Sequence, residues 1–290
     1  MEKVKLTAKD YKTQIPIVWC PGCGDFGVLA AIQQAVADLQ IPPEKLGVVS
    51  GIGCSSRIPG YINAYGFNSI HGRPLPIATG AKVANPELTM LVAGGDGDGY
   101  SIGTNHFVHA IRRNPDLTYI VMDNRIYGLT KGQVSPTTPT GDVTKTTPSG
   151  NPERPLNPLA LALELGATYI AQGFSGNVKH LKELIKKGIA HKGFALINVL
   201  SPCVTFRGKQ EYDYVRDHGV YLEDTDHDPS DWNAAHEVTQ WMLTKNQVPL
   251  GILYQVEGRK TLADEIAEVQ ERARAKKVYR DVRELIEQFR

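Results

Sequence analysis

The sequence has no excess charge of either sign and no long hydrophobic run. Its 32 basic residues nearly balance its 31 acidic residues, which argues against a surface that binds nucleic acid or anionic membranes. No segment approaches the ~20 consecutive apolar residues that a membrane-spanning helix needs. Residues 1–15 lack the apolar core of a signal peptide. We therefore expect a cytoplasmic protein that binds neither nucleic acid nor membrane.

Cysteine is also scarce, and the chain has only Cys20, Cys23, Cys54 and Cys203. Because the cytoplasm keeps thiols reduced, two structural disulfides are not expected, and buried free thiols are the ordinary alternative. The spacing, however, joins a Cys-Pro-Gly-Cys pair to two distant single cysteines. Four thiolates suit either zinc or an iron–sulfur cluster. Structural zinc more often uses two local pairs, but spacing alone does not separate the two metals.

Segments with strand and helix periodicity alternate along the first 200 residues. Short apolar, β-branched runs predict buried strands at residues 46–50, 88–93, 117–122, 167–171 and 195–200. Helical periodicity predicts helices at residues 26–39, 102–112 and 178–190. This alternation is typical of an α/β fold, in which helices cover both faces of a mostly parallel sheet.

The rest of the chain differs in composition from this alternating part. Residues 127–158 are rich in Thr, Pro, Ser and Gly, and so long a loop is usually functional or mobile. Residues 232–243 predict an amphipathic helix and residues 250–256 a further strand. Residues 262–290 are highly charged and helical, which indicates a solvated helix or an arm that wraps a partner. We therefore divide the chain into an α/β domain at 1–256 and a charged helical tail at 257–290.

Residues that can ligate a metal follow four of the predicted strands: Cys54, Asp96, Asn124 and Cys203. In open parallel sheets, ligands bind beyond the carboxyl ends of the strands. Asp96 and Asn124 offer oxygen ligands of the kind that Mg²⁺ takes together with a bound phosphate. The glycines around Asp96 allow close approach of the backbone, and the following helix presents its positive end. The alternative is a pair of ordinary turns, because Gly, Asp and Asn all favour turns.

Six blocks of sequence together resemble the β subunit of the two-subunit 2-oxoacid:ferredoxin oxidoreductases. In chain order, from residue 19 to 203, they are WCPGCGDFGVL, SGIGCSSR, HGRPLPIATGAK, GGDGDGYSIGTNH, MDNRIYGLTKGQ and SPC. The resemblance implies the thiamine-diphosphate-binding fold and the oxidative decarboxylation of a 2-oxoacid, or the reverse carboxylation. It also implies coenzyme A as acyl acceptor and ferredoxin as electron acceptor. A cluster beside thiamine diphosphate would receive the electrons that the decarboxylation releases.

The resemblance also implies roles for individual residues. The four cysteines would bind a 4Fe-4S cluster, and Asp96, Asn124 and the carbonyl of Ile126 would hold magnesium. The pocket for thiamine diphosphate would further include His71, Gly72, Gly97, Asp98, Gly128, Leu129, Thr130 and Lys131. The ordinary alternatives are a turn histidine at His71 and a surface lysine at Lys131, and we assign neither a role in proton transfer.

The choice of substrate depends on Arg57. Relatives carry a basic residue three positions after the cysteine that corresponds to Cys54, and this basic residue faces the substrate. Arg57 matches that position. A guanidinium can hold the distal carboxylate of 2-oxoglutarate with two hydrogen bonds, and pyruvate has no such group. We therefore expect conversion of 2-oxoglutarate to succinyl-CoA and CO₂. A pyruvate-specific or broad 2-oxoacid enzyme is the alternative, and a zinc-stabilised binding module without redox activity is the alternative from another class.

No catalytic residue is assigned within this chain. Thiamine enzymes need a glutamate beside the pyrimidine ring, normally supplied by a second α/β domain, and the sequence has no second strand–helix series. We expect a larger α subunit to supply this glutamate, in an αβ unit or a dimer of αβ units. The active site would then lie at the subunit interface.

Overall fold

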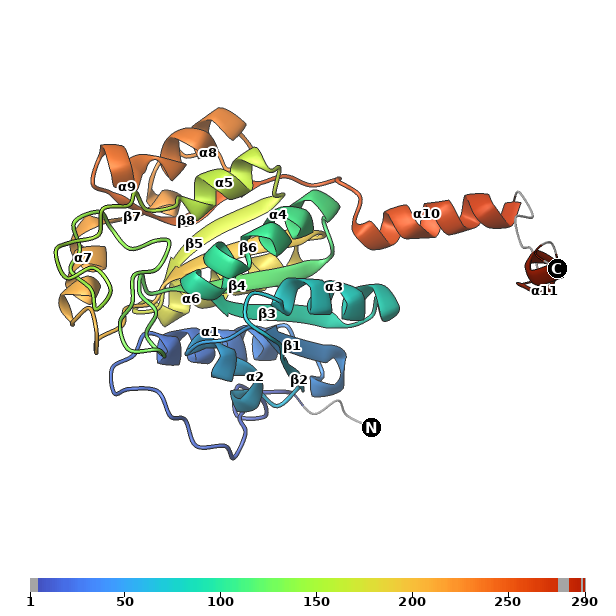
Figure 1. The fold of residues 1–290 in the computed structure, drawn as a ribbon, viewed down its shortest axis with the longest axis horizontal. Helices are drawn as coiled ribbons and strands as arrows, with labels where there is room; N and C mark the ends of the chain where they lie inside the picture. Colours follow the sequence, from blue (N-terminus) through green and yellow to red (C-terminus); the bar gives the residue numbers. More distant parts are fainter. Residues whose placement is uncertain (1–4, 276–281, 288, 290) are drawn as a thin grey trace.

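A twisted sheet forms the centre of the molecule in the computed structural model, which describes residues 5–275, 282–287 and 289 (Figure 1). Within this described part the sheet has eight strands, in the order β2-β1-β3-β4-β6-β5-β8-β7. Their bounds are β1 (Leu46–Ser50), β2 (Tyr65–Asn68), β3 (Thr89–Gly95), β4 (Leu117–Asp123), β5 (Tyr169–Phe174), β6 (Phe194–Leu200), β7 (Gly219–Tyr221) and β8 (Val248–Gln255). The six strands from β2 to β5 run parallel, and β8 is antiparallel to β5.

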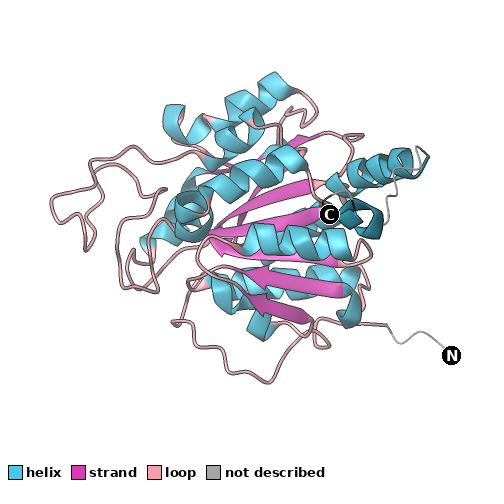
Figure 2. Ribbon diagram, turned by 45° about the vertical axis from the view of Figure 1, so that its right-hand side comes forward, coloured by secondary structure: helices cyan, strands magenta, loops and turns pink. Residues whose placement is uncertain are grey.

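Helices cover both faces of this sheet, as Figure 2 shows. One hydrophobic cluster joins α1 (Asp25–Asp38) and α6 (Val178–Ala190) to one face. A second cluster joins α3 (Pro74–Ala84), α4 (Thr104–Arg113), α5 (Pro158–Glu164) and α8 (Trp232–Thr239) to the other. Side chains of a strand alternate between faces, so Ile120 and Met122 of β4 pack in the first cluster and Tyr119 and Val121 in the second. The predicted α/β fold with a mostly parallel, doubly covered sheet is therefore confirmed.

The remaining helices are short or lie outside these layers. They are α2 (Ile58–Tyr61), α7 (Gln210–His218), α9 (Trp241–Thr244), α10 (Leu262–Ala275) and α11 (Val282–Glu287), with short helical turns at η1 (Pro43–Lys45), η2 (Ser55–Arg57), η3 (Asp98–Ile102) and η4 (Leu222–Asp224). Figure 1 shows α10 projecting away from the sheet, and none of its residues is buried. No helix among the described residues is long and apolar enough to cross a bilayer.

Most predicted elements agree with the structure, and the differences have local causes. The strand predicted at 167–171 is β5 at Tyr169–Phe174, because Gly173 and Phe174 continue the pairing with Val199 and Leu200 of β6. The helix predicted from residue 102 begins at Thr104, after the π-helical turn η3. The single helix predicted at 232–243 is wrong in detail, since Gln240 separates α8 from α9.

Residues 124–157 contain no helix or strand, as predicted for a long loop. The loop is nevertheless packed against the sheet, because Ser135, Thr137, Thr138 and Asn151 are buried. The division at residue 256 stays a prediction: β8 ends at Gln255 and α10 begins at Leu262. Within the predicted tail, residues 276–281, 288 and 290 lie outside the described residues.

Candidate functional site

Four neighbouring strands carry the predicted ligands at their carboxyl ends. Cys54, Asp96, Asn124 and Cys203 follow β1, β3, β4 and β6, which are adjacent in the sheet in that order. From β1 the chain continues to β2 on one side and then to β3 on the other, so the connections diverge between β1 and β3. Such a topological switch point opens a crevice for ligands. The four predicted ligands therefore lie at one edge of the sheet, and their roles stay a prediction.

A cavity of about 110 Å³ occupies this switch point, and we call it the strand-end cavity. Most residues predicted for the cofactor pocket line it: His71, Asp96, Gly97, Asp98, Asn124, Ile126, Gly128, Leu129 and Thr130. Gly72 and Lys131 are not among the lining residues. The structure thus brings together in one cavity residues that are up to 59 positions apart in the sequence, from His71 to Thr130.

Asp96 is a buried carboxylate that accepts a hydrogen bond from Thr137. Its Oδ2 lies 2.9 Å from the hydroxyl of Thr137, which also lies 2.8 Å from Oδ1 of Asp123. Burial raises the pKa of Asp96, and the neighbouring Asp123 carboxylate raises it further. An ionised Asp96 is therefore costly here without a cation, and a divalent metal ion would offset that cost. Sequence reasoning missed Thr137, whose only signal was its place in the polar loop.

Asp98 has a different environment from Asp96, although the two are only two residues apart. Its Oδ1 accepts hydrogen bonds from the backbone amides of Ile52, at 2.9 Å, and Gly72, at 2.7 Å. The same oxygen lies 2.6 Å from Nδ1 of His71. Asp98 therefore ties the loop after β1 to the turn at His71 and Gly72. Gly72 has a φ of +70°, and a Cβ there would lie 2.6 Å from the amide nitrogen of Gly103, so glycine is required.

Asn124 and Gly97 also line the strand-end cavity. Oδ1 of Asn124 accepts a hydrogen bond of 3.0 Å from the amide of Ile126, which turns the chain directly after β4. The hydroxyl of Tyr127 donates to the carbonyl of Gly97 at 3.0 Å. A Cβ at Gly97 would lie 2.3 Å from the Tyr127 ring, so any side chain at that position would displace the tyrosine.

A second cavity, of about 280 Å³, is lined by all four cysteines, and we call it the cysteine cavity. The thiols are free, with Cys20 exposed and the other three partly exposed. Gly128 lies between two of them: a Cβ there would be 3.6 Å from Sγ of Cys203 and 3.7 Å from Sγ of Cys54. In the described part of the chain, no three His, Cys, Asp or Glu side chains are arranged to hold one metal ion.

Close backbone packing brings the distant cysteines together. The amide of Gly24 donates to the carbonyl of Pro202 at 3.1 Å, and a Cβ at Gly24 would lie 2.6 Å from Oγ of Ser201. The indole of Trp19 donates to the carbonyl of Cys54 at 2.9 Å. These contacts fix the Cys20–Cys23 segment against the two loops that carry the single cysteines.

The cysteine cavity favours protonated thiols when nothing is bound. Burial raises the pKa of Cys54 to about 12 and raises the pKa values of Cys23 and Cys203 as well. Thiolates in such a place need the positive charge of a metal. The four-thiol donor set and the cavity size therefore fit a metal cluster.

Asp25 is a buried group that sequence reasoning missed. Its Oδ1 accepts a hydrogen bond of 2.7 Å from the hydroxyl of Ser201. Burial raises the pKa of Asp25 to about 6. Asp25 lines the strand-end cavity, and its signal in the sequence was its position directly after the Cys-Pro-Gly-Cys-Gly run.

The two cavities adjoin each other. Cys54, Asn124, Gly128 and Leu129 line both of them. Arg57 is exposed and, like Lys131, lines the cysteine cavity rather than the strand-end cavity. Groups bound in the two cavities would be separated by no more than these shared side chains.

Two family models match the chain. Residues 51–199 match the thiamine pyrophosphate enzyme, C-terminal TPP binding domain. Residues 203–271 match the C-terminal part of the pyruvate ferredoxin oxidoreductase beta subunit. The first match contains every residue that lines the strand-end cavity except Asp25, and the second begins at Cys203.

The chain is also similar to curated proteins and to a solved structure. It is 48% identical to the 2-oxoacid:ferredoxin oxidoreductase subunit beta of Saccharolobus solfataricus, over 86% of this chain and 85% of the relative. It is 46% identical to the 2-oxoglutarate synthase subunit KorB of Methanocaldococcus jannaschii, over 68% of this chain and 73% of the relative. The 2-oxoglutarate:ferredoxin oxidoreductase from Magnetococcus marinus, solved with 2-oxoglutarate, coenzyme A and succinyl-CoA bound, matches with a TM-score of 0.89 and 45% identity, over 93% of this chain and 92% of that chain.

Proposed function

Because this chain belongs to the β subunits of the 2-oxoacid:ferredoxin oxidoreductases, we propose that its two adjoining cavities bind thiamine diphosphate and a 4Fe-4S cluster. The enzyme it forms with the α subunit would oxidatively decarboxylate 2-oxoglutarate to succinyl-CoA and CO₂, or run the reverse carboxylation. The observation that carries this proposal is the wall of four residues shared by the strand-end and cysteine cavities. That wall puts a four-thiol site next to the pocket of a thiamine-diphosphate-binding domain.

The strand-end cavity supports a magnesium–diphosphate site. Asp96 would supply a charged ligand, and Asn124 and the carbonyl of Ile126 would supply neutral oxygens. Because the Asp96 carboxylate is buried and its pKa is raised, a nearby cation would stabilise its ionised form. The cofactor would be surrounded by Gly97, Gly128, Leu129 and Thr130. Asp98 would hold His71 and Gly72 in place beside the pocket. Lys131 would reach the site from the cysteine cavity.

The cysteine cavity supports a cluster over zinc because its volume of about 280 Å³ is large for a single ion. Zinc bound by four thiolates requires four sulfurs at about 2.3 Å from one centre. Thiamine diphosphate would supply the decarboxylation chemistry, and the cluster would pass the released electrons to ferredoxin one at a time.

The residues of this chain position and shield these groups. The Asn124 turn and the Tyr127–Gly97 hydrogen bond hold the loop after β4 against the loop after β3. Leu129, which lines both cavities, would exclude water from the boundary between them. Asp25 and Ser201 would hold the start of α1 beside the cluster.

The choice of 2-oxoglutarate rests on Arg57 and on the names of relatives. Arg57 lies exposed at the rim of the cysteine cavity, where its long side chain is free to meet a distal carboxylate. A 2-oxoglutarate synthase subunit and a structure with bound 2-oxoglutarate are among the similar proteins. The second candidate is a pyruvate or broad 2-oxoacid enzyme, favoured by the match to a pyruvate ferredoxin oxidoreductase domain.

The same proposal includes the partners. The α subunit would supply the glutamate that activates the thiazolium ring, in an αβ unit or a dimer of αβ units in the cytoplasm. Coenzyme A would be the acyl acceptor, as the ligands of the Magnetococcus marinus structure suggest. Residues 1–256 would form the catalytic unit and residues 257–290 a separate tail.

One preparation tests the main claims. The two subunits, co-expressed and purified without oxygen, should be brown and contain about four iron atoms per β chain, as a 4Fe-4S cluster requires. They should reduce ferredoxin with 2-oxoglutarate and coenzyme A, and faster than with pyruvate. Stoichiometric zinc in a colourless, air-stable protein would refute the cluster, and faster turnover of pyruvate would favour the second candidate.

A further inference from the structure

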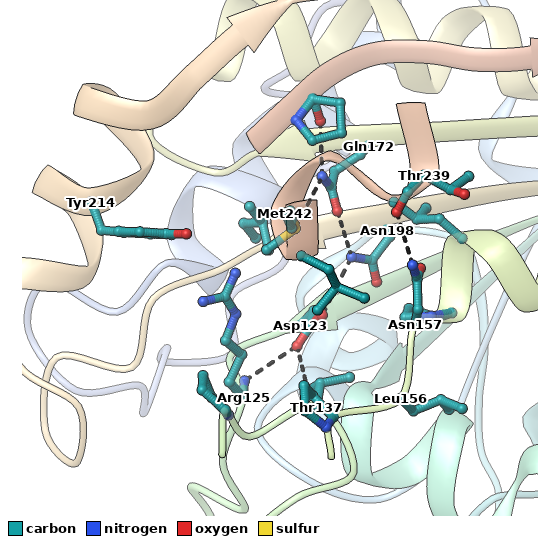
Figure 3. A pocket seen from close by; sticks show the side chains of 17 residues that line it. Asp123, Arg125, Thr137, Leu156, Asn157, Gln172, Asn198, Tyr214, Thr239 and Met242 are labelled. Carbon is teal, nitrogen blue, oxygen red and sulfur yellow. Dashed lines mark hydrogen bonds between the residues drawn. The ribbon is translucent and has the colours of Figure 1, made fainter. Parts of the chain in front are cut away.

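A third cavity, of about 190 Å³, lies beyond the carboxyl ends of β4, β5 and β6. Figure 3 shows its lining side chains, which come from these strands and β8, from the loop after β4, and from α5, α7, α8 and α9. It shares no lining residue with the strand-end or cysteine cavity. It is therefore separate from the two cavities proposed to hold the cofactors.

The polar groups on the floor of this third cavity bond to one another. Asn198 donates from Nδ2 to Oε1 of Gln172 at 3.1 Å and lies 3.3 Å from Oδ2 of Asp123. Gln172 in turn donates to the carbonyl of Pro249 at 2.8 Å. Because these polar groups already form hydrogen bonds within the protein, they need none from a ligand.

Arg125 is the exception among the lining residues. Figure 3 shows its guanidinium extending into the space between Tyr214 and Met242. Its Nη2 is buried and has no hydrogen-bond partner among the described residues, and its Cζ lies 5.6 Å from the centre of the Tyr214 ring. The backbone at Arg125 adopts a φ of +58°, a conformation that is unfavourable for arginine and that directs this charged side chain from the loop after β4. Arg125 as a whole is half-buried, but its buried Nη2 has no acceptor among the described residues, and an anion in the cavity would supply one.

The walls limit what kind of anion fits. Apart from Arg125 the sides are mainly apolar, with Leu156, Leu159 and Met242 facing the space. The nearby Asp123 carboxylate disfavours a second negative charge on the ligand. At about 190 Å³ the cavity is smaller than the 300–1,000 Å³ typical of drug-sized sites. These features together describe a small molecule with one negative charge and an apolar body.

We propose that this cavity binds a small organic monocarboxylate, whose carboxylate pairs with the Arg125 guanidinium and whose apolar body packs on Leu159 and Met242. A guanidinium offers two parallel N–H donors that match the two oxygens of a carboxylate. Leu243, 55% exposed, and Tyr214 line the mouth through which the acid would enter. The site is distinct from the place proposed for the 2-oxoacid substrate.

The test measures binding to the two-subunit enzyme by calorimetry and saturation-transfer NMR. The probes are benzoate and hexanoate, each paired with its neutral amide, benzamide or hexanamide. We expect each acid to bind at least tenfold more tightly than its amide. Arg125→Gln should remove this difference, because the amide side chain keeps polarity but loses the charged fork. Met242→Trp should fill the cavity and weaken the acid and the amide alike.

A matched control is available on α7. The guanidinium of Arg216 lies 5.8 Å from the ring of Tyr212, in a similar stacked geometry but paired with Asp213 on the surface. Arg216→Gln should leave binding of all four probes unchanged. If Arg125→Gln does not assemble with the partner, Met242→Trp and Arg125→Lys carry the test, the lysine keeping only part of the preference for acids.

Several outcomes would overturn the proposal. These are no saturable binding of either acid at millimolar concentration, equal affinity for acid and amide, or an unchanged preference in Arg125→Gln. Displacement of the acids by saturating 2-oxoglutarate would place them in the active site and would equally refute a separate cavity site. The measurement needs no turnover, so its outcome does not depend on whether the proposed reaction is correct.

Discussion

Replacing Gly128 by alanine should separate the stability of the protein from its ability to hold a cluster. The added Cβ would lie 3.6 Å from Sγ of Cys203 and 3.7 Å from Sγ of Cys54, which is ordinary van der Waals contact in the metal-free protein. Gly128 does not have a positive φ, so its backbone accepts alanine without strain. The metal-free chain should therefore tolerate the change.

The substitution should raise the stability of the metal-free protein slightly and lower the iron content of the enzyme. Alanine restricts the unfolded chain, so at a compatible position it stabilises a protein by about 0.4–1 kcal/mol. The same methyl group projects between two of the four proposed cluster ligands, where the iron and sulfide atoms would have to lie. We expect at least a fourfold loss of iron from Gly128→Ala, together with unchanged or slightly raised stability of the metal-free protein.

The assay is iron analysis and electron paramagnetic resonance of the reduced enzyme, alongside denaturant unfolding of the metal-free chain. Gly80→Ala is the matched control, because a Cβ at Gly80 in α3 has nothing within 4 Å. It should gain a similar stability and keep its full iron content. Full iron and a native signal in Gly128→Ala would show that the cluster does not fill the space between Cys54 and Cys203, and would refute the reasoning.

Three further substitutions test the remaining assignments. Cys203→Ser should remove the cluster signal while leaving thiamine diphosphate binding measurable by calorimetry, and a native signal would exclude Cys203 as a ligand. Asp96→Asn keeps the shape but loses the charge, so cofactor affinity with Mg²⁺ should fall at least tenfold; unchanged affinity would move the metal elsewhere. Arg57→Ala should lower kcat/KM for 2-oxoglutarate roughly 30- to 150-fold, as loss of about 2–3 kcal/mol implies. Turnover of pyruvate should change much less, and a constant ratio of the two efficiencies would remove Arg57 from substrate choice.

The sequence predicted the central sheet well because its strands are buried on both faces. All seven residues of β4 and of β6 are buried, so these strands appear in the sequence as mainly apolar runs. The opposite case is β2, whose four residues are all exposed and which pairs only with β1. Such an edge strand carries no apolar run, and the sequence analysis missed it.

Some residues of the candidate site could be predicted from the sequence and others could not, for a similar reason. Asp96 and Asn124 follow recognisable strands, so their convergence could be expected from the fold. Thr137 lies in an irregular loop, and only the folded chain brings its hydroxyl within 2.9 Å of Asp96. Asp98 shares its motif with Asp96, yet the turn η3 directs it to the amides of Ile52 and Gly72. A motif identifies candidate carboxylates, and the folded chain decides which groups each of them contacts.

Exposed apolar side chains surround the two adjoining cavities. Large apolar side chains are exposed at the edges of both cavities: Ile52 at 41%, Leu129 at 48% and Phe206 at 40%. Val18, which lines the cysteine cavity, is 63% exposed. Apolar patches around a concave site are typical of surfaces that a partner covers. A subunit seated here would shield the cysteine cavity from oxygen and water and bring its own glutamate to the strand-end cavity, so one interface would meet both chemical requirements of the proposed reaction.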